Sequence, residues 1–322
     1  MFQIPFKISP SQKKIDLKDQ VVCLGSCFSE NIGSQLADHK VKTLINPFGT
    51  FYNPWSIFKL LRVTVGEGID PNHVVFHQGV WHHWDAHSQL SSPDRDQFDE
   101  LIKTASATTK EHLMEARWLI LTFGSAYVYT HLDHQAIVAN CHKVPGDQFK
   151  KSLLETEFIV TEYQKTLTTL RTVNPGLRTI LTVSPVRHLR DGLPENNLSK
   201  SILLQACHRI VEQDPESYYF PAYELMIDVL RDYRFYAADL VHPNDQAIQY
   251  LWERFCDACV HPPTSEFFQE WGKILRSLNH RPFHPNTVEH RDFLKTLHRK
   301  LEAFAEKVNV SEELARIQSQ LT

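Results

Sequence analysis

Short strand-like runs and helix-like segments alternate along most of the chain, and this alternation is the strongest constraint on its fold. Strand character recurs at five places, which are residues 20–25, 41–45, 118–123, 178–183 and 218–220. Helical spacing follows, directly or after an irregular stretch, at residues 29–38, 54–61, 96–115, 149–173, 199–212, 223–232 and from 245 onward. Such alternation favours an α/β protein in which right-handed crossovers place helices on both faces of a parallel sheet.

Two stretches interrupt this alternation, and a different pattern begins near residue 261. Residues 62–95 and about 130–147 lack regular spacing and are interpreted as irregular insertions over the core. Beyond them, apolar residues from Leu294 to Val308 recur every three or four positions, which is a short heptad-like seam. We therefore predict a main domain at residues 1–260 and a helical extension at residues 261–322. Because the seam is short, packing of the extension on its own domain is favoured over a homodimer contact.

Composition excludes several classes of protein. The formal charge is −4 and the basic residues are scattered, so nucleic acid is not an expected partner. The chain has no charged leader followed by an apolar stretch and no run of about 18 apolar residues, which predicts a cytoplasmic protein without a membrane partner. Its six cysteines are dispersed, and the single Cys-x-x-Cys, Cys256 to Cys259, falls in a predicted helix. Neither a disulfide framework nor a zinc ribbon is therefore expected.

The turn after the first strand offers a nucleophile. Residues 20–33 form an apolar run that ends in Gly25-Ser26 and passes directly into a helix. Ser26 therefore follows the carboxyl end of a strand, beside backbone N–H groups that a helix N-terminus leaves without intrahelical partners. This position suits a hydroxyl nucleophile with a nearby anion site. It also suits an ordinary capped turn, because Ser is a preferred N-cap residue.

A second stretch, residues 238–244, supplies groups that activate such a hydroxyl. Asp239 and His242 are three positions apart on one loop, so the carboxylate can hold one imidazole nitrogen while the other faces a serine. In a sheet of order 2-1-3-4-5, the reactive crevice lies between the first and third strands, which precede Ser26 and Gly124-Ser125. The sequence therefore predicts a Ser-His-Asp centre at this edge of the sheet.

Several motifs then carry a family resemblance. Residues 24–33, Leu-Gly-Ser-Cys-Phe-Ser-Glu-Asn-Ile-Gly, resemble the signature of the GSCFA family, a branch of the SGNH-type hydrolases, with Ser29 standing where the family name has Ala. Other stretches similar to that family are residues 46–50, 184–188 and 231–236 and the Asp239-x-x-His242 motif. The resemblance implies a flavodoxin-like α/β/α three-layer sandwich. It also implies Ser26 as the nucleophile, His242 as its base and Asp239 as the orienting acid.

The same resemblance suggests the donors of an oxyanion hole. It implies the backbone N–H groups of Ser26 and Gly49, together with the side chain of an Asn after the third strand. The chain departs from this pattern, because Ala126 stands where that Asn is expected. Loss of an oxyanion donor lowers the rate on the order of a hundredfold or more. Either another polar group substitutes or the chemistry is slower or altered, and the candidate substitutes are Ser125, Asn140 and His142.

Other residues near the strand ends are candidates for lining a substrate pocket. They are Gly124, Ser125, Asn140, His142, His87 and Arg187. Ser125 also follows a strand-end glycine, so it is a rival nucleophile. Cys27 is another rival, but adjacent residues at a strand-to-helix turn usually point apart, and we expect Cys27 to pack in the interior.

The segment around Trp81 and Trp84 has the residue types of a metal site. These residues are His82, His83, Asp85 and His87. The interleaved tryptophans and the lack of an H-E-x-x-H pattern favour an aromatic loop over the active site instead. Neither a metal nor another cofactor is predicted.

These observations predict a serine esterase that hydrolyses an acyl ester through the Ser-His-Asp centre. A carbohydrate or small-metabolite ester is the expected substrate, by analogy with the family's relatives. An acyltransferase is the nearest alternative, because the same acyl-enzyme serves both reactions. A non-catalytic ligand-binding protein on the same scaffold is a further alternative, which the departure at Ala126 favours.

Overall fold

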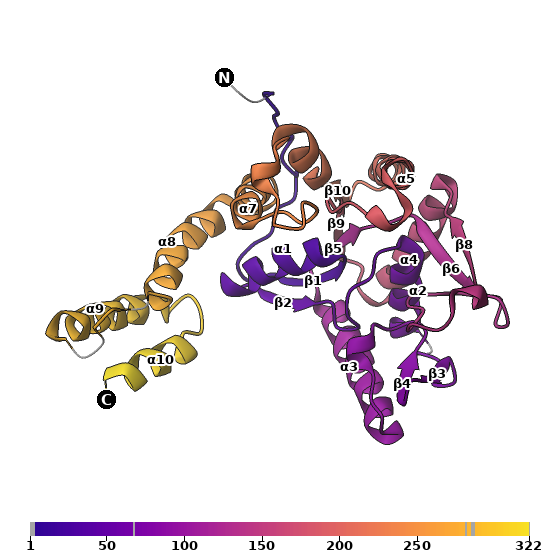
Figure 1. Ribbon diagram of the computed structural model, residues 1–322. Helices are drawn as coiled ribbons and strands as arrows, with labels where there is room; N and C mark the ends of the chain where they lie inside the picture. The colour runs from indigo at the N-terminus through magenta and orange to yellow at the C-terminus, as the bar shows by residue number, and fades with distance from the viewer. Residues whose placement is uncertain (1–3, 67, 281, 285–286, 322) are drawn as a thin grey trace.

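The computed structural model describes residues 4–66, 68–280, 282–284 and 287–321. Some predicted segments extend beyond these residues. Outside the described part lie residues 1–3 of the first predicted domain, position 67 of its first insertion, and positions 281, 285–286 and 322 of the predicted extension. The described chain forms an α/β body from which a helical arm projects to one side (Figure 1).

Five parallel strands form the central sheet of the body. They are β1 (Gln20–Gly25), β2 (Lys42–Ile45), β5 (Trp118–Phe123), β9 (Arg178–Val183) and β10 (Ser217–Tyr219), in the order β10-β9-β5-β1-β2. Counted along the chain, this is the order 2-1-3-4-5 on which the predicted crevice depends, and the predicted α/β fold with a central parallel sheet is confirmed. The strand order reverses between β1 and β5, where Gly25 pairs with Thr122. A reactive site is therefore expected outside the carboxyl ends of these two strands.

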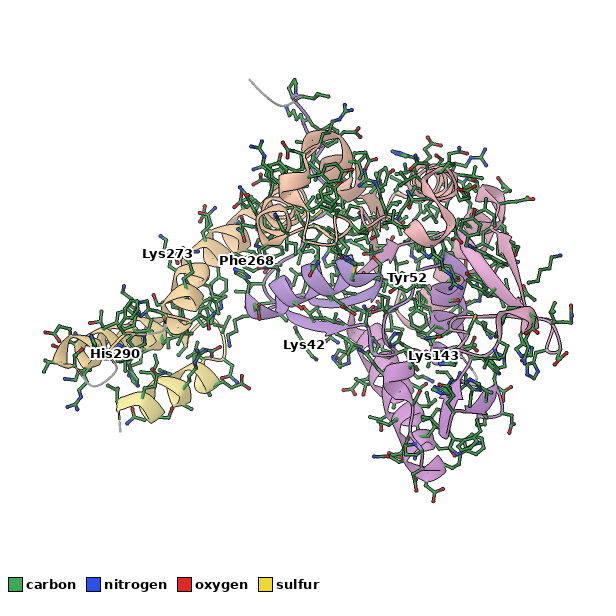
Figure 2. The ribbon with its side chains drawn as sticks, viewed as in Figure 1. Lys42, Tyr52, Lys143, Phe268, Lys273 and His290 are labelled. Carbon is green, nitrogen blue, oxygen red and sulfur yellow. The ribbon has the colours of Figure 1, made fainter. Side chains whose placement is uncertain are left out.

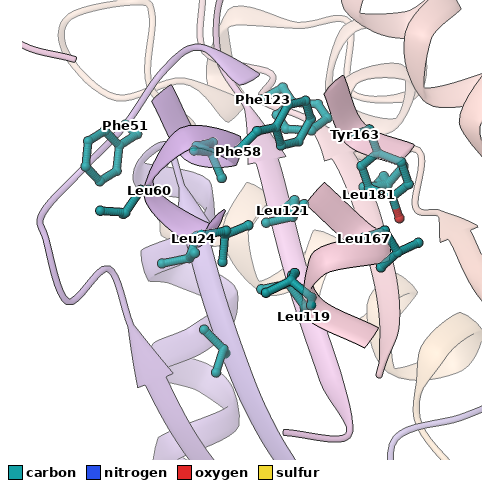
Figure 3. Packing of buried hydrophobic residues seen from close by; sticks show 14 of the residues in the cluster. Leu24, Phe51, Phe58, Leu60, Leu119, Leu121, Phe123, Tyr163, Leu167 and Leu181 are labelled. Carbon is teal, nitrogen blue, oxygen red and sulfur yellow. The ribbon is translucent and has the colours of Figure 1, made fainter. Parts of the chain in front are cut away.

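Each face of the sheet is covered by its own helices. Val22 and Leu24 of β1 pack with α2 (Pro54–Val65), α3 (Arg95–Glu115), α4 (Thr156–Val173) and α5 (Leu193–Gln213). Val21 and Cys23 point the other way and pack with α1 (Cys27–Asp38) and α7 (Asp245–Cys259). Figure 3 shows the first of these two cores, in which leucines of neighbouring strands lie beneath the helices. The result is the α/β/α three-layer arrangement that the family resemblance implied.

The first stretch predicted to be irregular, residues 62–95, contains a β-hairpin. After the end of α2 it holds β3 (Val74–His77), β4 (Val80–His83) and the 3-10 helix η1 (Ser88–Leu90). The two strands are antiparallel and form a small sheet of their own. Their side chains are mostly half-buried on both sides, so the sequence lacks the alternation by which a strand is recognised.

The second such stretch belongs to a three-stranded antiparallel sheet. Its strands are β6 (Tyr127–His131), β7 (Ala136–Val138) and β8 (Phe149–Leu153), with the 3-10 helix η2 (Gly146–Gln148) before β8. The prediction of a helix from residue 149 is wrong at its start, because α4 begins only at Thr156. Phe149, Lys151 and Leu153 are partly buried while the residues between them are exposed, which is the period of a strand paired with β6.

Two further helices differ from their predicted bounds. The helix predicted at residues 199–212 begins earlier, at Leu193, after the 3-10 helix η3 (Leu189–Asp191). The helix predicted at residues 223–232 is short, because α6 (Ala222–Glu224) continues as the π-helix η4 (Leu225–Val229) and ends there. The 3-10 helix η5 (Tyr233–Phe235) then leads into the loop that carries Asp239 and His242.

Three helices form the C-terminal arm, which are α8 (Pro262–Leu278), α9 (Val288–Phe304) and α10 (Ser311–Leu321). In the predicted heptad-like seam, Leu294, Leu297 and Leu301 are buried within the chain's own apolar cluster, together with residues of α8 and α10. Trp271 of α8 donates a hydrogen bond to the Asp38 carbonyl at 2.8 Å, which attaches the arm to the end of α1. No helix in the described part of the chain combines the length and apolar character needed to cross a membrane.

Candidate active site

Ser26 stands at the junction of β1 and α1. It occupies the N-cap position of α1 with extended backbone (φ −73°, ψ 176°), but its side chain makes no capping hydrogen bond. The residue is 1% exposed, and within the described chain its Oγ has no hydrogen-bond partner. Burying an unpaired polar group costs roughly 1–3 kcal/mol. The structure thus keeps an uncommitted hydroxyl at the position of the predicted nucleophile.

Gly25 allows the chain to turn sharply before Ser26. Its φ of +134° is strained for any residue with a side chain, and an added Cβ would lie 2.1 Å from the carbonyl oxygen of Thr122 on β5. Its N–H donates to the Asn46 side-chain oxygen at 2.9 Å. Asn46 also donates to Glu30 of α1 at 3.1 Å, so the turn is held from both sides.

The segment after β2 crosses over the carboxyl ends of β1 and β5. The N–H of Phe51 donates to the Gly25 carbonyl at 3.0 Å, and the Tyr52 carbonyl accepts the N–H groups of Gly124 and Ser125 at 2.7 and 2.8 Å. The side chain of Tyr52 is about half exposed and lies over the body, far from Lys273 and His290 on the arm (Figure 2). This crossing segment, residues 46–53, therefore covers the strand ends beside Ser26.

Both backbone donors predicted for the oxyanion hole are already engaged. The Ser26 N–H donates to the Thr122 carbonyl at 3.2 Å, and the Gly49 N–H donates to the Asn46 carbonyl at 2.7 Å. Gly49 has φ +82°, and His87 lies so close that an added Cβ on Gly49 would be 2.2 Å from its Cβ. In this conformation neither N–H is free for a substrate oxyanion, and their role stays a prediction.

Asp239 and His242 form a close pair on the loop after η5. His242 Nδ1 lies 2.6 Å from Asp239 Oδ2, and the other carboxylate oxygen accepts the N–H groups of His242 and Val241 at 3.0 and 2.9 Å. The backbone N–H groups of His242 and Val241, followed by the His242 ring, hold the pKa of Asp239 down at about 2. Both side chains are about half exposed, and the described residues include no hydrogen bond between His242 and Ser26.

Arg187, a predicted pocket residue, connects the end of β9 to this loop. Its guanidinium donates to the Tyr236 hydroxyl at 2.9 Å and lies 5.5 Å from the centre of the Tyr236 ring. Tyr236 in turn pairs with Pro243 in an antiparallel bridge, next to His242. Arg187 therefore supports the loop that carries the Asp-His pair.

Ser125 is not placed as a nucleophile would be. It is buried, its N–H donates to the Tyr52 carbonyl, and its Oγ accepts the Tyr127 N–H at 3.1 Å. Ala126, where an Asn was expected, is fully buried and donates its N–H to Ser199 Oγ at 2.8 Å. These contacts fix the start of β6 and leave Ser26 as the stronger candidate.

Lys200 lies at the same edge of the sheet, although no motif in the sequence predicts it there. It is 1% exposed, and its ammonium group donates to the carbonyl oxygens of Gly124 at 2.6 Å and Ser184 at 2.7 Å. These carbonyls follow β5 and β9 at the same edge of the sheet as Ser26. Burial lowers the pKa of Lys200 to about 7. One signal was present in the sequence, since Lys200 falls in line with Leu203, Cys207 and Ile210 on the apolar face of α5.

Cys27 differs from its expected place in the interior. It lies in the first turn of α1 and is only partly buried. Burial and the nearby Glu30 carboxylate raise the pKa of its thiol, while Lys200 acts in the opposite direction. Cys27 therefore shares its surroundings with charged groups rather than with the apolar core.

Three other predicted pocket residues make contacts within the insertions. His142 uses both ring nitrogens, with the His83 carbonyl at 2.8 Å and Ser88 Oγ at 3.1 Å, and burial lowers its pKa to about 4. The Asn140 side chain accepts the His142 N–H at 2.9 Å. The His87 N–H donates to the Phe48 carbonyl at 2.9 Å. His87 thus bonds the crossing segment, and a pocket role for each of the three stays a prediction.

A cluster of metal-ligand type also forms, in which His83 and Asp85 of the predicted group are joined by His73 and not by His82 or His87. His73, His83 and Asp85 bring ligand-type atoms within 4.8 Å of one another. Asp85 pairs with Lys59 at 2.6 Å and with His73 at 2.9 Å. The His83 ring bonds the Asp70 carbonyl and the Asp85 N–H. The positive charge beside Asp85 is thus supplied by Lys59, and these groups form a hydrogen-bonded network.

Comparison with known families agrees with this architecture. A model of the GSCFA family matches residues 20–255, which include Ser26, Asp239 and His242. The chain belongs to the GSCFA family. A second model, described as the C-terminal domain of GSCFA domain proteins, matches residues 271–322 in the arm.

Among solved structures, this GSCFA protein resembles two esterases at low identity. A carbohydrate esterase family 3 protein from Talaromyces cellulolyticus is 10% identical, with 78% of this chain and 99% of that chain covered and a TM-score of 0.35. An acetyl xylan esterase (Est2A) from the rumen bacterium Butyrivibrio proteoclasticus is also 10% identical, with 78% and 64% covered and a TM-score of 0.37. Both TM-scores are low, so neither protein decides the activity of this chain. No curated protein matches it in sequence.

Ser29, which stands where the GSCFA name has Ala, has a structural explanation here. It is fully buried, and its Oγ contacts the Leu24 carbonyl at 2.9 Å and Thr122 Oγ1 at 2.7 Å. The hydroxyl therefore bridges the ends of β1 and β5 beneath Ser26. An alanine at this position leaves both strand ends without that bridge.

Proposed function

We propose that this GSCFA protein is a serine esterase, with Ser26 as the nucleophile, His242 as the general base and Asp239 as the orienting acid. The observation that carries the proposal is the 2.6 Å contact between His242 Nδ1 and Asp239 Oδ2, because it fixes the tautomer in which Nε2 can accept a proton. The uncommitted Oγ of Ser26 supports it from the other side of the site. A surface histidine without a carboxylate partner would not have its tautomer fixed in this way.

The reaction follows from these roles. His242 Nε2 takes the proton of Ser26 Oγ as that oxygen attacks the acyl carbonyl, and the resulting tetrahedral oxyanion collapses to an acyl-enzyme. The departing alcohol receives the proton from His242. Water then attacks the acyl-enzyme, with His242 again acting first as base and then as acid, and releases the carboxylic acid and the free serine.

Substrate binding has two tasks in this mechanism. It brings Ser26 and His242 into hydrogen-bond contact, since catalytic hydrogen bonds in ligand-free sites are often long and tighten only in the complex. It also opens access to Ser26 Oγ and frees the Gly49 N–H from the Asn46 carbonyl, which requires movement of the crossing segment. The half-exposed ring of Tyr52 on that segment offers a stacking surface for a sugar or other small alcohol portion of the ester.

Two alternatives each draw on a specific observation. The burial of Ser26 Oγ favours acyl transfer, because a site that excludes water protects the acyl-enzyme until an acceptor hydroxyl arrives. The engaged N–H groups of Ser26 and Gly49 favour a binding protein without catalysis. Esterase and transferase differ only in whether an added alcohol competes with water for the acyl group.

Labelling with a fluorophosphonate, with the adduct located by peptide mass spectrometry, tests the proposal. We expect an adduct on Ser26 that is absent in Ser26→Ala and strongly slowed in His242→Ala, with hydrolysis of p-nitrophenyl acetate lost in parallel. Ser125→Ala is the matched control and should label as the native protein does. An adduct on Ser125 or Cys27, or ester hydrolysis that persists in Ser26→Ala, contradicts the assignment of Ser26. Absence of both labelling and hydrolysis favours the binding protein.

A further inference from the structure

Lys200 is a buried cation without a carboxylate partner. Its side chain reaches from α5 to the carboxyl edge of the sheet, where its two hydrogen bonds go to the carbonyl oxygens of Gly124 and Ser184. Among the described residues no Asp or Glu pairs with it. Lysine is almost never fully buried unless it is paired, so the position of Lys200 calls for an explanation beyond packing.

The start of α5 is polar on the side that faces the sheet edge. Asn196, Ser199 and Lys200 are all buried, and each bonds the chain that follows β5 or β9. Asn196 accepts the His188 N–H at 2.8 Å, and Ser199 accepts the Ala126 N–H at 2.8 Å. The two N–H groups thus bond neutral side chains, whereas the carbonyl oxygens of Gly124 and Ser184 bond the ammonium group of Lys200. Two carbonyl oxygens alone could be satisfied by water or an amide, which carry no such desolvation penalty.

The charge of Lys200 is coupled electrostatically to the Cys27 thiol, in the turn that carries Ser26. Of the groups around it, the Cys27 thiol raises the pKa of Lys200 and Arg187 lowers it further, although burial dominates. In return, Lys200 opposes the rise in the pKa of Cys27 that burial and Glu30 cause. Cys27 follows Ser26 directly, so a charge coupled to its thiol is also close in sequence to the proposed nucleophile.

We propose that Lys200 is a positioning residue of the active site, which ties the ends of β5 and β9 together and supplies a positive charge that acts on the turn after Ser26. Its action on catalysis rests on the proposed function, in which the tetrahedral oxyanion forms at Ser26. There the protonated form of Lys200 lowers the energy of the oxyanion without touching it, as preorganised electrostatics do in a site that excludes water. Because the Ser26 N–H donates to the Thr122 carbonyl, this contribution becomes more important.

Alkylation of Cys27 measures this field without any assumption about esterase activity. The rate of modification by iodoacetamide, followed by peptide mass spectrometry, reports the thiolate fraction of Cys27. In Lys200→Gln, whose amide keeps a donor for the carbonyls but carries no charge, we expect the rate at pH 6.5 to fall on the order of tenfold. Lys200→Arg should keep it within about twofold. Lys103→Gln, the same change at an exposed lysine of α3, is the control.

The native protein provides a test that needs no variant. Among the described residues, the charges of Glu30, Tyr52 and Lys200 are coupled to Cys27, and Lys200, with a pKa of about 7, loses its charge near neutral pH. The logarithm of the alkylation rate should therefore rise less steeply with pH above about 7 than below it. A straight rise from pH 5.5 to 8.5, or unchanged alkylation in a folded Lys200→Gln protein, overturns the proposal.

A second readout separates the proposal from the esterase assignment. In Lys200→Gln the rate of fluorophosphonate labelling at Ser26 should fall on the order of tenfold, in parallel with the slower alkylation of Cys27. If Ser26 does not label even in the native protein, the esterase assignment fails. The alkylation rate of Cys27 still tests whether the charge of Lys200 acts at the turn. If alkylation falls but labelling of Ser26 is unchanged, the charge is present and its proposed part in catalysis is refuted.

Discussion

His242 Nδ1 lies 2.6 Å from Asp239 Oδ2, while the other oxygen of the same carboxylate accepts two backbone N–H groups. Three donors therefore converge on one exposed side chain, and its pKa falls to about 2. Leu240, between the two residues, has φ +60°, which turns the loop tightly enough for this geometry. The carboxylate is thus held as an anion, in one orientation, throughout the physiological pH range.

Replacing Asp239 by Asn should lower kcat/KM for ester hydrolysis on the order of a thousandfold or more, because the amide no longer fixes the tautomer of His242. Since the pKa of Asp239 is about 2, its own titration should leave no step in the pH-rate profile between pH 5 and 8. Asp232→Asn is the matched control, because Asp232 makes a similar bond to the Arg234 N–H in the same region. A loss of equal size in the control would show that loop folding, and not His242, is affected.

Replacing Gly25 by Ala should strongly destabilise the protein. The new Cβ would lie 2.1 Å from the Thr122 carbonyl oxygen in a backbone conformation with φ +134°. We expect a loss of roughly 3 kcal/mol or more in the free energy of unfolding, or no folded protein. Urea unfolding measures it, with Gly146→Ala as the control because an added Cβ there meets nothing within 4 Å. Equal stability of the two variants would contradict the predicted clash.

Ser29→Ala should destabilise the protein by about 1–3 kcal/mol, because its hydroxyl bridges the Leu24 carbonyl and Thr122 Oγ1 in a fully buried place. A double-mutant cycle with Thr122→Val isolates the contact between the two hydroxyls. The double variant should be more stable than the sum of the single losses implies, by roughly 1 kcal/mol. Simple additivity in urea unfolding would mean that this hydrogen bond adds nothing to stability.

The strands of the main sheet could be predicted because they are local apolar runs separated by helices. β8 could not, since the strand character of Phe149 and Lys151 is created by pairing with β6, which is a tertiary contact. The sequence of this segment continues into α4 without a break such as Gly or Pro. Propensity alone therefore extended the helix by about two turns.

Less of the site could be predicted than of the fold. Gly25-Ser26 and the Asp239-His242 pair are local motifs, and their positions follow from the strand-to-helix turn and the loop. The engagement of the Gly49 N–H depends on a φ of +82° and a contact with His87, which no spacing in the sequence reveals. Lys200 was overlooked because a lysine on a helix is normally exposed, although its position lies on the apolar face of α5.

The burial of Lys200 makes a prediction about stability and pH. Its pKa is about 7 in the folded protein, against about 10.4 in an unfolded chain. Between these values the unfolded chain binds one more proton than the native protein, so stability rises with pH by up to about 1.4 kcal/mol per unit. Below pH 7 Lys200 is protonated in both the folded and the unfolded chain, and the full cost of burying its charge lowers the stability of the fold.

Lys200→Met removes the titrating amine, so the part of the pH dependence of the unfolding free energy that comes from Lys200 should disappear. From pH 7 to pH 9 the native protein should gain about 2 kcal/mol in unfolding free energy relative to the variant, whatever the difference between them at pH 7. Urea unfolding at several pH values measures this difference, and comparison of the two proteins cancels the titration of the buried thiols. Lys103→Met, at an exposed lysine, should follow the native curve. Parallel curves for Lys200→Met and the native protein would show that Lys200 keeps an ordinary pKa, and that its two carbonyl contacts fully compensate its burial.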